Sequence, residues 1–383
     1  MQVKLSQILS TLESGGRPKG GASLDNKGIP SLGAEHLDGN GGFNFKTVKY
    51  IPEEYFNGLK NGIIEKEDIL IVKDGATTGK VSFVTDDFPF DRAAVNEHVF
   101  LLKVDKSKAN PKFTFHYLKC PQGQRDIMRD FRGATVGGIS RGFVDFVKFA
   151  LPSLPDQLHI ATILSKAENL IAQRKESIRL LDEFLKSTFS EMFGDPMRNE
   201  KGWETKQLGS VTQMKAGQFV AASDIQPEYS EGLYSCYGGN GLRGYVKTYT
   251  HEGAFVLIGR QGALCGNVKI AKGQFHATEH AVVCSPKMEF ETYWLYYLLD
   301  VINLNKYASG AAQPGLAVGR LEQIEIIFPP PLLQTQFAHI VEKAEALKNQ
   351  YQQSLTELEN LYGSLSQKAF KGELSLKTNH VNP

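Results

Sequence analysis

The 383-residue chain has little of what disulfide-bonded, metal-knuckle and membrane proteins depend on. No run approaches the ~18 consecutive apolar residues of a membrane span, and no apolar signal core follows Met1. We therefore expect a cytoplasmic protein without a membrane segment. The cysteines form no close pair, which argues against a C-x-x-C metal knuckle and a disulfide framework; they are Cys120, Cys236, Cys265 and Cys284.

Several catalytic signatures are also missing. The chain has no G-x-S-x-G elbow, no Rossmann fingerprint with its acidic partner, and no N/D-P-P-Y/F tetrapeptide of amino-methyltransferases. The stretch "KDGATTGKV" resembles a P-loop, but only three residues separate Gly75 from Gly79. Val81 then follows Lys80, where a P-loop needs Ser or Thr for magnesium. We predict a tight hairpin there instead of a nucleotide site, and no enzyme activity in this chain.

The charge is nearly balanced, with 43 basic and 42 acidic residues and a formal net charge of +1. Such a total does not argue for a large acidic partner, although local basic surfaces remain compatible with it. Hydrophobic residues make up 41% of the chain and aromatic residues 10%, enough to bury sizeable cores in two or three domains.

What the chain does contain is an internal repeat. "RGATVGGIS" (132–140) matches "SGAAQPGLA" (309–317) at a shift of 177 positions, and this register continues for about 60 residues. Upstream, "VNEHVFLL" matches "ATEHAVVC", and "ILIVKDGATTGKV" matches "FVLIGRQGALCGNV". The second match places Gly262 and Gly266 over the hairpin glycines of the first copy. Asn267 then replaces the lysine, which further weakens the phosphate-loop interpretation.

The repeated E-H dipeptide also bears on metal binding. "HATEH" (276–280) has two histidines four residues apart, but it is not H-E-x-x-H and its flanks read as a strand. The first copy keeps Glu97 and His98 without a second histidine. We therefore expect a structural or DNA-facing polar pair and no metal.

Each copy ends in a segment with the a/d spacing of a coiled coil. The segments follow "LPSLPDQ" and "FPPPLLQ", where proline fixes the entry to a helix. About 37 residues at 1.5 Å each form a rod of roughly 55 Å. Two independent helices, each packed on its own domain, are the alternative; the matched phase favours helices packed on each other. The predicted seam contains Ile160, Leu164, Ile171, Ile178, Leu181 and Leu185, with Val341, Tyr351, Leu355, Leu358 and Tyr362.

The globular parts mix strands and helices. Runs such as "DILIVKDG", "EHVFLLKV" and "GAFVLIG" are rich in β-branched and aromatic residues and predict strands of an antiparallel-rich sheet. Residues 113–131 and 292–307 are each expected to form a helix. The class is therefore α+β.

The loops carry side chains of the kinds that bond base edges and phosphates. Ordinary polar loops are the alternative for any one of them. The candidate DNA-binding residues are Lys73, Thr77, Thr78, Lys80, Arg92, Arg132, Arg141, Lys215, Gln218, Asn240, Arg243, Arg260, Gln261, Asn267, Gln313 and Arg320.

Taken together, these features resemble the specificity (S) subunits of Type I restriction-modification systems. The resemblance covers nearly the whole chain. It rests on the duplicated globular units, on the glycine loops, and on a P-x-x-x-x-Q-x-x-(I/F)-A pattern that opens both helices in "LPSLPDQLHIATIL" and "FPPPLLQTQFAHIV".

The resemblance implies two tandem target-recognition domains of mixed α/β structure, related by a pseudo-twofold repeat and separated by two long helices in an antiparallel coiled coil. The expected division is 1–155, recognition domain 1; 156–194, helix 1; 195–331, recognition domain 2; 332–372, helix 2; and 373–383, tail.

It also implies function and partners. Each domain would read one half of a bipartite double-stranded DNA target, and the coiled coil would set the spacer and dock the methyltransferases. The two readers differ outside the shared framework, so an asymmetric target is expected. Partners would be two modification subunits using S-adenosylmethionine and two restriction subunits using ATP and magnesium, with no cofactor on this chain. A Type IIB-like specificity subunit and a duplicated protein-binding scaffold are the alternatives.

Overall fold

The protein divides into two compact units, each built from one globular region and the adjoining parts of both long helices. Unit 1 comprises residues 1–173 and 355–383, and unit 2 comprises residues 174–354. The computed structural model describes residues 2–25, 27–133, 137–262, 265–310 and 315–374. Because both helices contribute to both units, the linear division of the chain into five segments stays a prediction.

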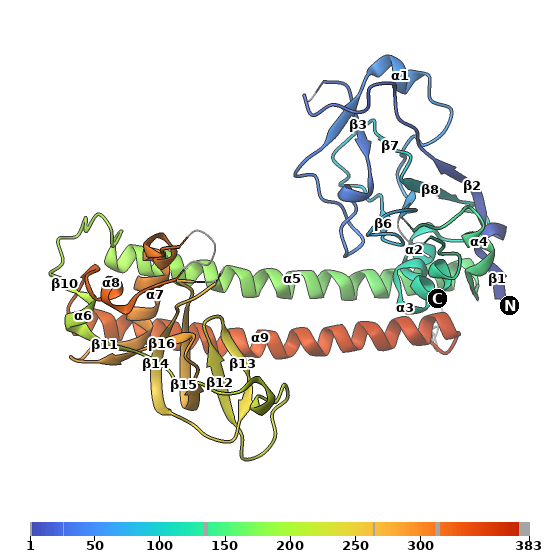
Figure 1. Cartoon of the computed structure of the whole chain (residues 1–383). Helices are drawn as coiled ribbons and strands as arrows, with labels where there is room; N and C mark the ends of the chain where they lie inside the picture. Colours follow the sequence, from blue (N-terminus) through green and yellow to red (C-terminus); the bar gives the residue numbers. More distant parts are fainter. Residues whose placement is uncertain (1, 26, 134–136, 263–264, 311–314, 375–383) are drawn as a thin grey trace, which may run out of the picture. The chain divides into compact units, whose positions relative to one another are not determined.

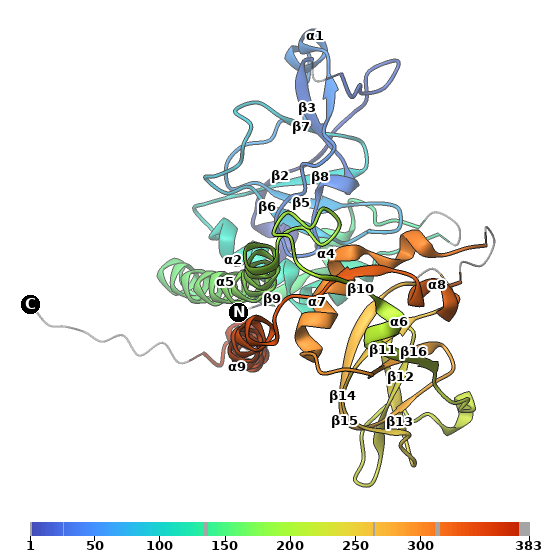
Figure 2. The same cartoon turned by 90° about the vertical axis from the view of Figure 1, so that its left-hand side faces the viewer.

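The centre of unit 1 is an antiparallel sheet in the order β2-β8-β5-β6 (Figures 1 and 2). The strands β4-β3-β7 form a separate sheet that includes a parallel pair. The remaining strands, β1 and β9, pair with each other. The strands are β1 Gln2–Lys4, β2 Leu9–Ser14, β3 Ile29–Leu32, β4 Lys49–Ile51, β5 Ile69–Val72, β6 Val81–Phe83, β7 Ala94–Val95, β8 Val99–Val104 and β9 Lys148–Ala150. The short helices are η1 Leu5–Gln7, η2 Ala34–His36, α1 Glu53–Asn57, α2 Pro111–Lys119, α3 Pro121–Met128 and α4 Phe143–Phe146.

The main sheet of unit 2 has the order β11-β16-β14-β15-β12-β13, and β10 and β17 pair separately (Figures 1 and 2). Among the described strands of the main sheet only the β12–β15 pair is parallel. The strands of unit 2 are β10 Thr205–Gln207, β11 Thr212–Ala216, β12 Tyr234–Gly238, β13 Gly241–Val246, β14 His251–Gly259, β15 Val268–Ala277, β16 Ala281–Pro286 and β17 Glu325–Ile327. The short helices are α6 Leu208–Val211, η3 Ala222–Asp224, α7 Thr292–Ile302, η4 Leu304–Tyr307 and α8 Val318–Glu322.

The two sheets share a four-strand framework. The order β2-β8-β5-β6 in unit 1 corresponds to β11-β16-β14-β15 in unit 2, strand for strand in chain order. The units differ in the segment between the first two framework strands. In unit 1 that segment forms β3, β4 and α1, whereas in unit 2 it adds the hairpin β12–β13 to the edge of the main sheet. The divergence of sequence between the copies is therefore concentrated in what decorates a common core.

The two predicted single helices are both interrupted. Residues 113–131 form α2 and α3, because Pro121 has no amide hydrogen to continue α2 and instead opens α3, where the Cys120 sulfur accepts a hydrogen bond from the Gly123 amide. In unit 2, α7 ends at Ile302 because Asn303 has a left-handed backbone with φ 57°. No described helix is long and apolar enough to cross a bilayer.

The long helices are α5, Leu154–Phe193, and α9, Pro331–Lys371. Within each unit they run antiparallel. In unit 1, Tyr362 bonds Glu168 while Ala369 packs in the same core as Ile160. In unit 2, the Arg174 guanidinium lies over the Tyr351 ring and Phe337 packs on Phe193.

Every predicted seam residue is buried or half-buried. The buried ones are Ile160, Leu164, Leu185, Val341 and Leu355; the half-buried ones are Ile171, Ile178, Leu181, Tyr351, Leu358 and Tyr362. The a/d pattern nevertheless missed Phe189 and Phe193, which are fully buried in the core of unit 2. These two face the globular region as well as α9, so the apolar stripe is wider there than a two-helix seam requires.

The P-x-x-x-x-Q pattern acts as a clamp at the start of each long helix. The Gln157 side-chain amide donates to the Pro152 carbonyl at 2.9 Å, and its oxygen accepts from the Asn110 amide at the start of α2 at 2.8 Å. Gln334 does the same with Pro329 at 2.8 Å and with the Glu291 amide at the start of α7 at 3.0 Å. Both glutamines are fully buried. Each long helix is thus tied to the first helix after the sheet of its own unit.

Candidate nucleic-acid interface

The hairpin between β5 and β6 carries the first group of predicted DNA-contacting residues. The Val72 amide donates to the Lys80 carbonyl at 2.9 Å, and the Gly79 amide donates back to Val72 at 2.9 Å. Gly75 and Gly79 have φ of 92° and 90°, values that L side chains rarely adopt. The backbone thus closes a hairpin, and its polar side chains are carried on a loop of fixed shape.

The hairpin between β14 and β15 repeats this geometry in unit 2. The Gly259 amide donates to the Asn267 carbonyl at 2.8 Å, and the Gly266 amide donates back to Gly259 at 2.8 Å. Gly262 and Gly266 have φ of 81° and 90°. The repeat seen in the sequence therefore extends to the individual hydrogen bonds of the loop.

Two further loops meet each hairpin. In unit 1 the Lys73 amide donates to the carbonyl of His98, from the E-H turn, and its carbonyl accepts from Ile139, from the glycine-rich loop, at 2.9 and 2.7 Å. In unit 2 Arg260 makes the same two bonds, to His280 at 3.1 Å and from Leu316 at 2.9 Å. We name these meeting points the first loop junction, formed by described residues of 73–80, 95–98 and 132–140, and the second loop junction, formed by described residues of 260–267, 277–280 and 309–316.

Glycines without room for a side chain hold the loops together. A Cβ at Gly15, at the end of β2, would lie 1.5 Å from the Val95 carbonyl oxygen, and one at Gly217, at the end of β11, would lie 2.1 Å from that of Ala277. Both glycines let the chain pass directly against the E-H turn. The close approach is built into the backbone of both junctions, and it leaves the outer side chains free to vary.

A histidine occupies the middle of each junction. The His98 Nδ1 lies 2.5 Å from the Asp74 Oδ1, and the His280 Nδ1 lies 3.1 Å from the Gln261 Oε1. On the other side of the ring, Nε2 lies 3.5 Å from the Glu97 carboxylate in unit 1 and 3.1 Å from the equivalent Glu279 carboxylate in unit 2. The E-H pair is thus a polar element of the loops. Among the described residues no group of three or more His, Cys, Asp or Glu could hold a metal ion.

The structure brings about half of the candidate DNA-binding residues to the junctions. Arg132, whose side chain is 76% exposed, flanks the first junction and pairs with Asp130. The Asn267 amide donates to the Asn240 oxygen at 2.7 Å, which attaches the β12–β13 turn to the second junction. The candidates at the first junction are Lys73, Thr77, Thr78, Lys80 and Arg132, and those at the second are Arg260, Gln261 and Asn267.

Other candidates lie beside the second junction. The Gln218 amide donates to the Ala277 carbonyl at 2.8 Å, directly before the E-H turn. Lys215 is exposed on β11, and Arg243 is exposed on β13 with its side chain against Gly238. These three lie on the strands and loops that border the junction.

Some candidates are elsewhere. Arg92 is held by α1, where its guanidinium donates to Glu53 at 2.6 Å and Asn57 at 2.8 Å; it does not join the first junction. Arg141 donates to the Leu12 carbonyl at 3.0 Å, and Arg320 lies on α8. Gln313 lies outside the described residues. Sequence reasoning grouped these residues by chemistry, since it could not tell which loops converge.

The E-H pairs, predicted from their recurrence in both copies to be structural or DNA-facing, form the polar centre of the junctions. Asp74 belongs to the same centre in unit 1 and was not among the predicted residues. It gives no signal of recurrence, since its counterpart is a glutamine.

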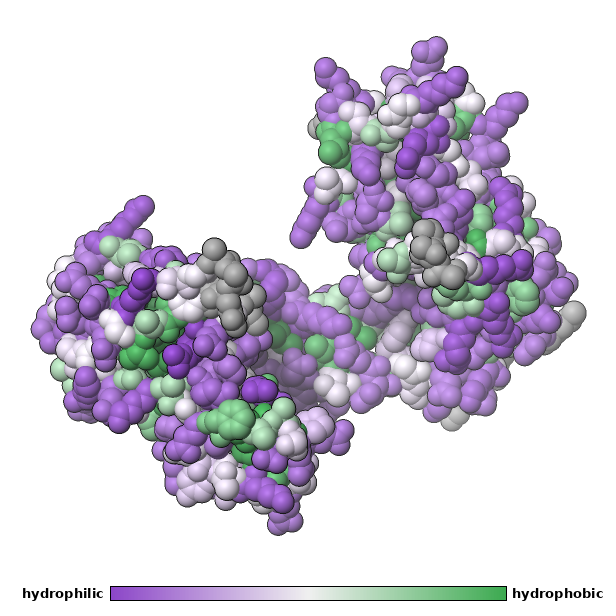
Figure 3. Space-filling model, in the orientation of Figure 1, coloured by the Kyte–Doolittle hydropathy of each residue, from purple (hydrophilic) through white to green (hydrophobic). Residues whose placement is uncertain are grey.

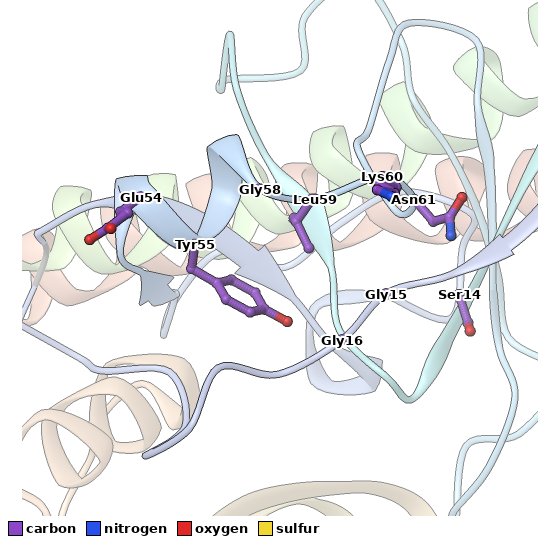
Figure 4. Close-up of a pocket in the computed structure, with 9 residues that line it drawn as sticks. All are labelled: Ser14, Gly15, Gly16, Glu54, Tyr55, Gly58, Leu59, Lys60 and Asn61. Carbon is purple, nitrogen blue, oxygen red and sulfur yellow. The ribbon is translucent and has the colours of Figure 1, made fainter.

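A pocket of about 550 Å³ adjoins the first junction (Figure 4). Tyr55, on α1, points toward the chain at Gly16, where a Cβ would come within 2.9 Å of the tyrosine hydroxyl. Asn61 and Ser14 line the other end. Arg17, which follows Gly16 in the chain, pairs with Glu97 at 2.9 Å and so connects this pocket to the E-H turn. Hydrophilic residues dominate the visible surface of each unit (Figure 3).

Comparison with known proteins places the chain in a family. The model of the Type I restriction modification DNA specificity domain matches residues 1–180 and 200–360. The EcoprrI Type I restriction enzyme specificity subunit of Escherichia coli is 34% identical over 326 residues, which cover 80% of this chain and 77% of that protein. The chain belongs to this specificity family. A more distant member, the MjaIX specificity subunit of Methanocaldococcus jannaschii, is 24% identical over 298 residues, 68% of this chain and 69% of that one.

Solved structures agree on the fold of the specificity family. The S subunit of a Type I restriction-modification system from M. genitalium superposes with a TM-score of 0.64, at 18% identity, over 97% of this chain and 96% of that chain. A chain from a structure on assembly and conformational transition of the type I system gives a TM-score of 0.58, at 18% identity, with 98% of each covered. The fold class inferred from the sequence, two recognition domains with two long antiparallel helices, is confirmed.

Proposed function

We propose that this chain is the DNA sequence-recognition subunit of a Type I restriction-modification complex and that each recognition domain reads one half of a bipartite target. One observation carries the proposal. The two loop junctions share their backbone hydrogen bonds, whereas the polar side chains they present are different. Sequence is read by side chains at base edges, while a constant backbone fixes where those side chains lie.

The difference between the junctions supports an asymmetric target. Thr77 and Lys80 of the first hairpin are replaced at the corresponding places of the second by other residues, Asn267 among them. Two readers with one framework and different side chains select different half-sites. The segments that decorate the framework differ as well, through α1 in unit 1 and the β12–β13 hairpin in unit 2.

The helices support a second role, as spacer and docking surface for methyltransferase subunits. They carry large apolar side chains that face solvent in the isolated chain: Leu170, Leu180, Phe184 and Leu361 are each 50% or 51% exposed. Exposed apolar residues on an otherwise charged helix fit a protein partner.

In this proposal the chain supplies recognition and no catalytic group, and it binds no cofactor. S-adenosylmethionine belongs to two modification subunits, and ATP with magnesium belongs to two restriction subunits. Together with double-stranded DNA these are the partners we propose, in the cytoplasm, where the target DNA is.

Exchange of one recognition domain tests the proposal. Residues 1–150, which end with β9 and so keep the β1–β9 pair intact, are replaced by the matching domain of a relative with a different target. We expect the methylated sequence, mapped by sequencing DNA modified by the assembled complex, to change in one half-site only. An unchanged target would contradict DNA reading and favour a protein-binding scaffold.

The unmodified complex, mapped in parallel, is the control and gives both half-sites and the spacer. Exchange of residues 195–331 should change the other half-site alone. A Type IIB-like enzyme would show the same bipartite target, so it is distinguished by purification of the complex: the proposed Type I assembly contains separate modification and restriction subunits.

A further inference from the structure

One position holds a carboxylate in the first loop junction, Asp74, and a carboxamide in the second, Gln261, although the neighbouring groups that hold it are the same. Asp74 and Gln261 each follow the residue that bonds both neighbouring loops, and each bonds the Nδ1 of the junction histidine. Each also forms a backbone bridge to the glycine-rich loop, Asp74 with Gly138 and Gln261 with Gly315. The two side chains are therefore equivalent in place and in partner.

The hydrogen-bonding group that remains available to a ligand is an acceptor at Asp74 and a donor at Gln261. An ionised carboxylate only accepts hydrogen bonds, so Asp74, with Oδ1 on His98, offers Oδ2 as an acceptor. Lys73 is 3.9 Å from that oxygen and leaves it room for a shorter bond. A carboxamide has one acceptor and two donors, so Gln261, with Oε1 on His280, offers its NH₂ group as a donor.

Neither side chain is needed to fill the core. The Asp74 side chain is 31% exposed and Gln261 is exposed. Gly138 makes room for Asp74 on the inner side, since a Cβ there would lie 2.9 Å from the Asp74 Cβ. An exposed polar group whose orientation is fixed by hydrogen bonds to its neighbours is suited to recognition.

We propose, on the basis of the proposed function, that Asp74 and Gln261 are specificity-determining residues, each reading one base of its own half-site. Asp74 accepts a hydrogen bond from an exocyclic amino group, that of cytosine or adenine. Gln261 donates to a base acceptor, O6 or N7 of guanine, N7 of adenine or O4 of thymine. His98 and His280 are positioning residues that fix the rotamers of Asp74 and Gln261 and touch no base.

Each histidine can position its neighbour because contacts on both sides of the ring hold the ring itself in place. His98 and His280 are 44% and 46% exposed, yet each ring is held on both sides, by the side chain at 74 or 261 and by the preceding glutamate. Removal of the ring frees Asp74 or Gln261 to rotate. That loss relaxes the choice at one base and leaves the neighbouring bases unaffected.

Near-isosteric exchange of acceptor and donor tests the assignment. Asp74→Asn and Gln261→Glu are each assembled with the modification subunits, and the methylated sequence is mapped. With Asp74→Asn, preference at one position of the first half-site should move from an amino-bearing base toward guanine or thymine. With Gln261→Glu, one position of the second half-site should move toward cytosine or adenine. A donor or acceptor left without its partner at the wrong base costs about 1–3 kcal/mol, so roughly 5- to 150-fold changes are expected.

The positioning role has its own readout. His280→Ala should reduce discrimination at the same single position that responds to Gln261→Glu, and at no other. A structural role alone would instead lower binding to all sequences equally. Asp87→Asn and Gln213→Glu make the same chemical changes at exposed residues outside both junctions and should leave the target unchanged.

The outcomes separate this inference from the function on which it rests. If the unmodified complex methylates no bipartite sequence, the proposed function fails. If it does, but Asp74→Asn and Gln261→Glu leave every base unchanged or alter the opposite half-site, the inference is wrong. A variant that assembles without methylating is scored by selection of bound DNA from a randomised library. An unchanged selected sequence, or loss of preference at several positions together, also overturns the inference.

Discussion

At Gly266 the hairpin of unit 2 leaves no space for any side chain. The residue has φ 90°, and a Cβ there would lie 2.4 Å from the Asn305 amide nitrogen, which belongs to backbone and cannot rotate away. The Asn305 side chain in turn donates to the Cys265 carbonyl at 2.8 Å. Gly262, in the same loop, has φ 81°, and an added Cβ there would have no atom of the described residues within 4 Å. Substitution by alanine therefore costs only backbone strain at Gly262, whereas at Gly266 it costs backbone strain and a steric clash.

We expect Gly266→Ala to destabilise unit 2 by roughly 2–5 kcal/mol, because backbone strain of about 1–2 kcal/mol adds to an overpacking term of about 1–3 kcal/mol. Gly262→Ala should cost only about the first of these. Chemical denaturation followed by tryptophan fluorescence measures both, since Trp203 and Trp294 are both in unit 2. Equal losses for the two variants would show that the close approach to Asn305 carries no energy.

Residue-scale prediction from sequence succeeds where the repeat supplies a second observation. The glycine pairs of the hairpins and the E-H dipeptide recur, and alignment alone places them at equivalent points. The contact between His98 and Asp74, 24 positions apart, has no periodic signature, so neither its partner nor its direction follows from the sequence. For the same reason the sequence did not reveal that the Arg92 side chain bonds Glu53 of α1 and lies away from the first junction.

At the scale of elements, a polar cluster joins α5, α9 and α2 within unit 1. The Glu168 Oε1 accepts from the Lys119 ammonium at 2.7 Å and from the Tyr362 hydroxyl at 2.7 Å. His116 lies at 3.7 Å from the same oxygen. Burial by itself raises the pKa of Glu168, but the neighbouring His116 and Lys119 outweigh it and lower this pKa to about 2.

A carboxylate whose folded pKa is lowered stabilises the protein fully above its ordinary pKa, 4.5 for Glu168, and loses this contribution as the pH falls toward about 2. We expect Glu168→Gln to destabilise unit 1 at pH 6 by roughly 1–3 kcal/mol. The difference from the unmodified chain should shrink between pH 4.5 and 2. Denaturation curves at several pH values measure it.

Glu357→Gln is the matched control, since Glu357 is exposed on α9 in the same unit. It should change stability little at any of these pH values. A Glu168→Gln difference that stays constant from pH 6 to pH 3 would show that the Glu168 charge does not stabilise the contact between the helices.

Heptad spacing and proline give strong signals for the two long helices, whereas the helices predicted at 113–131 and 292–307 are both interrupted. The helices predicted at 156–194 and 332–372 are observed at Leu154–Phe193 and Pro331–Lys371. The width of the buried stripe was not predictable, as Phe189 shows, because it depends on what covers the helix. The clamp made by Gln157 was visible as a motif, yet its partner at the start of α2 appears only in the fold.

At the scale of the whole molecule, both long helices are continuous through the place where the two units adjoin in sequence, near Arg174 and Tyr351. Residues inserted into a continuous helix lengthen it by a fixed amount, because each residue adds 1.5 Å along the helix axis. If the recognition domains read two half-sites, the length of these helices sets the number of unread base pairs between them.

Paired insertion of four residues, after Lys175 in α5 and before Tyr351 in α9, tests this relation. The antiparallel pairs on either side, Arg174 with Tyr351 and Asp182 with Lys348, keep their partners. Four residues lengthen each helix by about 6 Å, so we expect the spacer to grow by roughly two base pairs while both half-sites stay unchanged. A seven-residue insertion, which preserves the heptad phase, is the control and should lengthen it by roughly three. Methylation mapping reads both quantities at once. An altered half-site with an unchanged spacer would mean that the helices do not measure the distance along DNA.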